Sequence, residues 1–172
     1  SKEEKITRDA EEVLRRSEEI IRRLLRRLEE VLKDLERSAR ENKKRLDKIL
    51  EDLAKLDTDR SVLKKAVEDV HKRDRETLKR HDEESKKVKD ELEELLRRHN
   101  KELRDVRDEL RRRGADEKRV KRMEEELRRL HEEVRRRVEK VKRDMDRLNK
   151  KIKEDSRRVN EEIRKLLEDK TR

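Results

Sequence analysis

A narrow apolar stripe runs along almost the whole chain at the spacing of one face of an α-helix. Its positions recur every three or four residues, as in Ile21, Leu24, Leu28, Val31 and Leu35. Such steps keep one side of a helix turned toward a partner helix. The average step lies between the heptad value of about 3.5 and the 11-residue value of about 3.67, which predicts a gentle left-handed supercoil. The stripe therefore predicts long α-helices that pack against one another.

Only two short segments interrupt this pattern, and both carry signals that end one helix and begin the next. In the first, at 57–61, Thr58 or Asp59 suits the N-cap of the helix that follows. In the second, Gly114 suits the left-handed position just after a helix, and Asp116 suits the next N-cap. Loops this short force neighbouring helices to run antiparallel.

These breaks predict an all-α fold, an antiparallel up-down-up bundle of three long, gently supercoiled helices. We expect one rod-shaped domain over residues 1–172, with Ser1 and Glu4 as a capping box at its start. The helices are expected at about residues 2–56, 60–113 and 117–170.

Composition excludes several other classes of protein. Charged residues make up 62% of the chain and apolar residues 27%, which alone would favour disorder, but the regular stripe favours long helices. The absence of cysteine excludes disulfides and cysteine-based zinc sites. No apolar run is long enough for a bilayer and the first residues do not resemble a signal peptide, so we expect no membrane partner and leave the compartment open.

The net charge of +10 raises the question of nucleic-acid binding. Basic residues are not gathered on one segment, and the chain has no aromatic residue that could stack on a base. We therefore expect no specific nucleic-acid partner. Weak, salt-sensitive binding to polyanions remains an alternative.

Polar residues replace apolar ones at chosen points of the stripe. Antiparallel helices align positions whose numbers sum to a constant, about 117 across the first loop and about 230 across the second. These sums predict three polar layers: Ser17 with His99 and His131, Ser38 with His81 and Asn149, and Asn42 with Asp74 and Ser156. Together with Thr77 and Ser85, they form a predicted buried polar network. Each layer is satisfied only in the correct register, so slipped pairings are penalised.

Three kinds of chemistry can be weighed for these residues. Serine, histidine and aspartate together suggest a hydrolase triad, but a helix interior offers no free backbone N–H for an oxyanion hole, so we expect no enzyme activity. His99 and His131 lack a third ligand for a stable zinc site, so no metal and no cofactor is expected, and His71 is expected at the half-exposed edge of the stripe.

A pH switch is the better-founded possibility. Burial should lower the pKa of His81 and His99 below about 6.5, so that acid between about pH 6 and 4 loosens the fold. Asp74, if it lies close to His81, would oppose this effect.

The first predicted helix has a wider apolar face than the other two, roughly 160° against 100–120°. One interpretation is an asymmetric core into which this helix packs more deeply. The other is a self-association face that would hold a homo-oligomer together. The residues of that possible face are Leu14, Leu25, Leu32, Leu50 and Ala54.

Three features characterise this chain: helices of nearly equal length, two minimal loops and polar residues within the apolar stripe. These polar residues are Ser17, Ser38, Asn42, Asp74, His81, Ser85, His99 and Ser156. In these features the chain resembles computationally designed (de novo) helical bundles with buried hydrogen-bond networks. The resemblance implies a structural scaffold without natural biochemical activity. The alternative is a pH-responsive homo-oligomer that loosens when its buried histidines are protonated.

Overall fold

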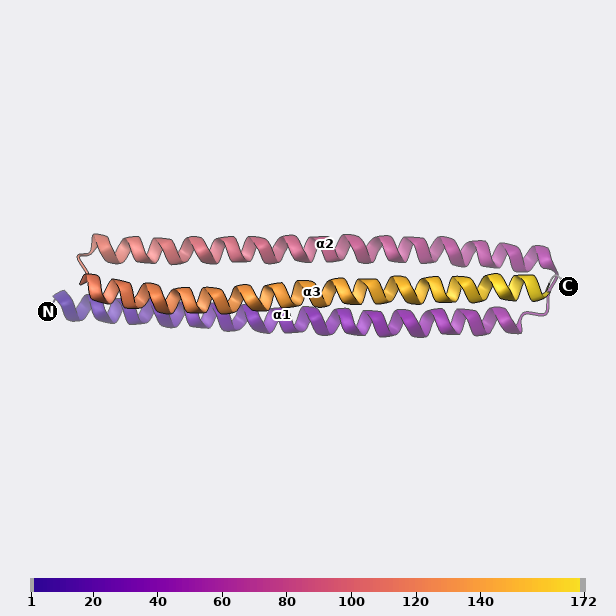
Figure 1. Ribbon diagram of the computed structural model, residues 1–172, viewed down its shortest axis with the longest axis horizontal. Helices are drawn as coiled ribbons and strands as arrows, with labels where there is room; N and C mark the ends of the chain where they lie inside the picture. The colour runs from indigo at the N-terminus through magenta and orange to yellow at the C-terminus, as the bar shows by residue number, and fades with distance from the viewer. Residues whose placement is uncertain (1, 171–172) are drawn as a thin grey trace. The chain divides into compact units, whose positions relative to one another are not determined.

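The computed structural model describes residues 2–170, except for the side chains of residues 3, 7 and 10. This range consists of three helices and the loops between them, which can be followed in Figure 1. Their bounds are α1 (Lys2–Lys55), α2 (Arg60–Arg112) and α3 (Glu117–Lys170). Each predicted bound lies within one residue of the observed one. Ser1, half of the predicted capping box, and the side chain of Ala10 lie outside the described residues.

The loop between α2 and α3 follows the glycine signal. Gly114 has a φ of 75°, the left-handed conformation that an L side chain rarely adopts. Its N–H donates to the carbonyl of Arg111 at 3.1 Å, and the N–H of Ala115 donates to the carbonyl of Leu110 at 3.1 Å. This pair of bonds is a Schellman motif, which satisfies carbonyls that the end of a helix otherwise leaves free.

The loop between α1 and α2 ends at the predicted cap Asp59. Its Oδ1 accepts a hydrogen bond from the backbone N–H of Val62 at 3.0 Å and another from the hydroxyl of Ser61 at 2.8 Å. These bonds, first that from Val62, lower the pKa of the Asp59 carboxyl because they favour its charged form. Asp59 is therefore the N-cap of α2.

The described residues form two compact units, and each contains a segment of all three helices. The first consists of 2–31 with 88–142, and the second of 32–87 with 143–170. In the first unit, Arg113 beyond the end of α2 pairs with Asp9 near the start of α1, so these helices run antiparallel. In the second, the ammonium of Lys170 in α3 donates to the carbonyl of Leu56, just after α1, so α1 and α3 run parallel. The predicted all-α, up-down-up three-helix bundle is thus confirmed.

The deepest part of the core belongs to α3. Among the described residues, nine large side chains are less than 2% exposed, and seven of them lie on α3, against one on α1 and one on α2. The interpretation that the first helix packs most deeply is therefore wrong. Two partners flank the narrow stripe of α3 and cover most of it. The seven are Val120, Val134, Val138, Met145, Ile152, Val159 and Ile163.

The wide face of α1 is covered only in part. Leu14, Leu25, Leu32 and Leu50 are half-buried, and Ala54 is exposed. Leu32 packs against the core around Ile152, and Leu50 against the core around Leu46. The exposed side chain of Ile20 retains 40% of its accessible surface. Two neighbours cannot cover a face roughly 160° wide, so apolar area remains at its edges.

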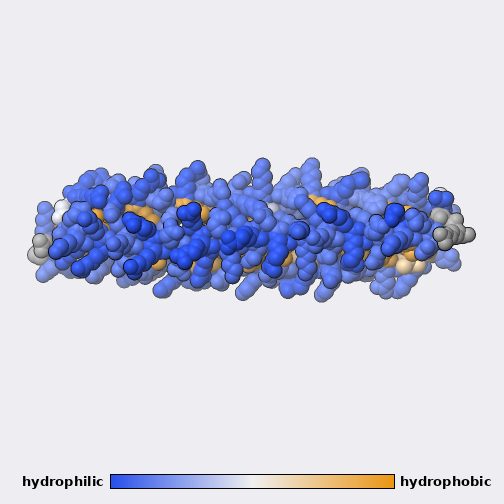
Figure 2. Space-filling view, viewed as in Figure 1, coloured by the Kyte–Doolittle hydropathy of each residue, from blue (hydrophilic) through white to orange (hydrophobic). Residues whose placement is uncertain are grey.

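The surface is dominated by charged side chains. Figure 2 shows one face on which hydrophilic residues cover nearly all of the area and hydrophobic atoms appear only in narrow gaps. Exposed pairs such as Arg16 with Glu12, at 2.8 Å, connect successive turns of one helix and stabilise it by about 0.3–0.5 kcal/mol each. Over residues 2–170, none of the helices has the length of apolar sequence needed to cross a lipid bilayer.

Candidate functional site

The most deeply buried polar contact joins α2 to α3 in the second unit. Ser156 is 3% exposed and its hydroxyl donates a hydrogen bond to Oδ2 of Asp74, which is 4% exposed. The other carboxylate oxygen, Oδ1, is buried without a partner among the described residues. A buried carboxylate with one hydrogen bond depends strongly on that bond, because the carboxylate has lost its hydration.

A second contact in this unit connects Asn149 of α3 to Ser85 of α2. The side-chain amide of Asn149 donates to the hydroxyl of Ser85 at 2.7 Å. The predicted layer placed Asn149 beside His81, one helical turn away from Ser85. Ser85 is buried, whereas His81 is half-buried. The hydrogen bond therefore forms with the more deeply placed of the two neighbours.

Asn42 brings α1 into this set of buried polar groups. It is 5% exposed, and its Oδ1 accepts a hydrogen bond from the guanidinium of Arg45 at 2.8 Å. Its Nδ2, a donor, is buried without a partner within the described range. The sequence predicts that Asn42 and Asp74 share one polar layer. In that layer, Oδ1 of Asp74 is an acceptor without a partner among the described residues. Asn42 and Asp74 are both buried, and both lie in the second unit, but no hydrogen bond joins them.

The first unit contains a pair of histidines between α2 and α3. The rings of His99 and His131 have centroids 5.7 Å apart and planes inclined by 27°. His99 is 4% exposed, and burial, followed by the charge of His131, lowers its pKa below the ordinary value. Nε2 of His99 and Nδ1 of His131 are buried, and neither has a hydrogen-bond partner in the described part of the chain. His99 and His131 thus lie together, as the predicted register of α2 and α3 requires. They meet as stacked rings and not through a hydrogen bond.

The remaining predicted network residues are less buried than expected. Ser17, Ser38, Thr77 and His81 are half-buried, and so is His71, for which this was expected. The hydroxyl of Thr77 donates to the backbone carbonyl of Arg73 on its own helix at 2.9 Å. Such a bond satisfies a hydroxyl within one helix, so Thr77 is not a link between helices.

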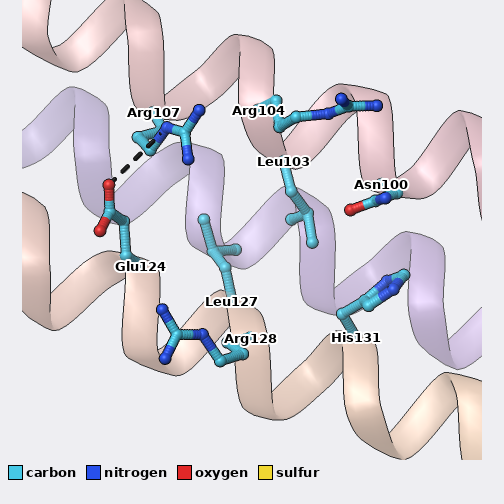
Figure 3. Close-up of a pocket in the computed structure, with 8 residues that line it drawn as sticks. All are labelled: Asn100, Leu103, Arg104, Arg107, Glu124, Leu127, Arg128 and His131. Atoms are coloured by element: carbon cyan, nitrogen blue, oxygen red, sulfur yellow. Dashed lines mark ion pairs between the residues drawn. The ribbon is translucent and has the colours of Figure 1, made fainter.

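One pocket beside the histidine pair was not predicted from the sequence. It lies between α2 and α3 in the first unit and has a volume of about 160 Å³. In Figure 3, Leu103 and Leu127 project into the space between the helices, with Asn100 and His131 at one end and Arg107 with Glu124 at the other. The lining also includes Arg104 and Arg128. The sequence alone does not distinguish the arginines of this lining from other charged surface residues. Only the fold places them around the same pocket.

Within residues 2–170, no group of three histidine, aspartate or glutamate side chains is placed to hold a metal ion. A scan of protein-family models found no match. Searches of curated proteins and of solved structures likewise found nothing similar.

Proposed function

We propose that this chain is a structural scaffold of designed origin, without catalytic activity, in which buried polar residues specify the register of the helices. The observation that carries the proposal is the hydrogen bond from Ser156 to the buried carboxylate of Asp74. The bond between Asn149 and Ser85 adds a second polar contact between the same two helices. Polar residues in an apolar seam reduce stability relative to apolar ones but penalise wrong pairings.

A slipped register illustrates this penalty. The smallest slip that preserves a coiled-coil stripe is one heptad. In one direction it places Ile163 opposite Asp74, which leaves a buried carboxylate without a partner. In the other direction it places Ser156 opposite Val67, within the apolar cluster of the second unit. The first slip buries a carboxylate without a hydrogen bond, and the second removes Ser156 from Asp74 and places its hydroxyl among apolar side chains. An all-leucine seam would tolerate both slips.

Distance measurements between spin labels test this proposal. The chain has no cysteine, so Glu76→Cys on α2 and Glu154→Cys on α3, both exposed, provide one labelled pair. We compare the labelled parent with a variant whose polar contacts are apolar: Asp74→Leu, Ser85→Ala, Asn149→Leu and Ser156→Ala. We expect one narrow distance distribution for the parent. The apolar variant should show a second population with a longer distance between the labels. In that population the labels are offset along the helix by about 10 Å, the rise of one heptad, which lengthens the distance between them by less than that.

A matched control changes the core but leaves the polar contacts intact. Ile152→Leu alters a side chain that is 1% exposed and should preserve the single distribution. If the apolar variant also retains one distribution at the parental distance, the polar residues do not specify register, and the proposal fails.

A pH-responsive homo-oligomer is the second candidate, supported by the buried position of His99 and its lowered pKa. Protonation would place a charge beside His131, which burial disfavours. The half-buried leucines of α1 and the exposed Ile20 would supply the contact between copies. Light scattering after gel filtration at about pH 7.4 and about pH 5 tests this function. A multiple of the 21.3 kDa chain mass that is lost in acid supports it, and a single-chain mass at both values excludes it.

A further inference from the structure

The pocket between α2 and α3 has an apolar floor and a cationic rim. Leu103 and Leu127 form the floor, and Arg104, Arg107 and Arg128 stand around it, with Glu124 as the one acidic residue of the lining. Engineered apolar cavities of about 150 Å³ bind benzene. The pocket, at about 160 Å³, therefore has room for a group of the size of a six-membered ring.

Some charged residues of the lining form ion pairs, and others do not. The carboxylate of Glu124 lies 3.1 Å from the guanidinium of Arg111 and 3.7 Å from Nε of Arg107. Arg104 and Arg128, by contrast, make no ion pair with any side chain that the structure describes. An anion entering the pocket would therefore meet two guanidinium groups without displacing an existing ion pair.

The two ends of the pocket differ in what they offer an anion. At one end Glu124 would repel it. At the other end, the side chains of His131 and Asn100 lie close together, and both residue types can donate a hydrogen bond. The favourable end for a negative group is thus the end with His131.

We propose that this pocket binds a small monocarboxylate with a compact apolar body, the body against Leu103 and Leu127 and the carboxylate at the His131 end beside Arg104. A guanidinium binds a carboxylate through two parallel hydrogen bonds, which a neutral group cannot form. The apolar floor distinguishes such a ligand from an inorganic oxyanion, which would leave the leucines uncovered. This site does not depend on the proposed scaffold role.

Benzoate is the probe, and the histidine ring resonances in NMR are the readout. A ligand of this size reaches roughly millimolar affinity. We expect saturable shifts of the His131 ring and of the Leu103 and Leu127 methyl groups, with no matching shift at His71. Benzyl alcohol, which has the same ring without the charge, and phosphate, which has charge without the ring, should each bind at least about ten-fold more weakly.

Variants locate the site without disturbing the core. Arg104→Gln combined with Arg128→Gln changes two exposed residues and should weaken benzoate binding by about ten-fold or more. Arg129→Gln is the matched control, because this exposed arginine neighbours Arg128 but does not line the pocket. Circular dichroism checks that all variants remain helical.

Four results would overturn the proposal. Equal binding of benzoate and benzyl alcohol would exclude recognition of the carboxylate, and equal binding of phosphate would exclude a role for the apolar floor. Equal weakening by Arg129→Gln, or shifts spread equally over all four histidines, would reduce the effect to general attraction by a chain of net charge +10.

Discussion

The hydrogen bond between Ser156 and Asp74 allows the energetics of a polar layer to be tested with a single substitution. Ser156→Ala removes the donor from a carboxylate whose other oxygen, Oδ1, already lacks a partner among the described residues. Asp74 is 4% exposed, so water cannot readily replace the lost bond. A hydrogen bond to a charged group contributes about 1.5–3 kcal/mol. We expect a loss of about 2–3 kcal/mol, or roughly 30- to 150-fold in the unfolding equilibrium constant.

Removing the acceptor should destabilise the fold much less than removing the donor. Asp74→Leu removes the buried charge, and the hydroxyl of Ser156 can then donate to a carbonyl of its own helix. We expect this variant to unfold within about 1 kcal/mol of the parent, because replacing a buried polar group by an apolar one of similar size is often nearly neutral. The double variant, Asp74→Leu with Ser156→Ala, should match or exceed the stability of the parent.

Equilibrium unfolding in urea at neutral pH, followed by far-UV circular dichroism, measures all three variants. Fluorescence cannot serve, because the chain has no tryptophan or tyrosine. The decisive comparison is between the two single variants. A loss below about 0.5 kcal/mol for Ser156→Ala, or equal losses for both, would mean that the Asp74 carboxylate is hydrated and the bond contributes little.

Three further predictions concern the loop, the core and the histidines. Gly114→Ala should destabilise by about 1–2 kcal/mol through the backbone alone, since no atom lies within 4 Å of the added Cβ; a change in melting temperature of less than a degree would refute this. Leu46→Ala, at a residue that is 1% exposed, should cost about 2–5 kcal/mol in urea unfolding. Because the folded pKa of His99 is lowered, only the unfolded chain takes up this proton as the pH falls through about 6.5, so stability should fall by up to about 1.4 kcal/mol per pH unit. His99→Leu should flatten this slope and His71→Gln should not.

The sequence predicts the helices well because their ends are set by local chemistry. Gly114 adopts the left-handed conformation that its position called for, and Asp59 accepts the hydrogen bond that an N-cap requires. These effects act over a few residues and depend little on the rest of the fold. The predicted bounds consequently differ from the observed ones by no more than one residue.

Register across the second loop is also predictable, but only to about one helical turn. His99 with His131 and Asp74 with Ser156 share the same sum of residue numbers, and both pairs meet. Asn149 reaches Ser85 instead of its predicted neighbour. A stripe pattern places a residue on a face, but the rotamers and the exact rotation of each helix decide which of two successive turns it contacts.

The width of the apolar face of a helix did not predict how completely its apolar side chains are buried. α1 has the widest face, but its leucines at positions 14, 25, 32 and 50 remain half-buried, while the narrow stripe of α3 is almost completely covered. Burial depends on partners as well as on composition. In a bundle of three, each helix has only two neighbours, so a face wider than they can cover places its edges in solvent whatever its hydrophobicity.

The balance of the core supports a role for its polar residues beyond stability. Among the described residues, the buried set contains twenty apolar and five polar side chains. A chain that is only 27% apolar has a small core, and exchanging buried polar groups for apolar ones is often neutral or stabilising. Stability alone therefore gives no reason to place Asp74, Ser85 and Ser156 in the seam. The proposed role in discriminating between registers would give one. Charged surfaces and repeating stripes leave many slipped pairings close in free energy, and a few buried polar contacts would separate the correct one from the rest.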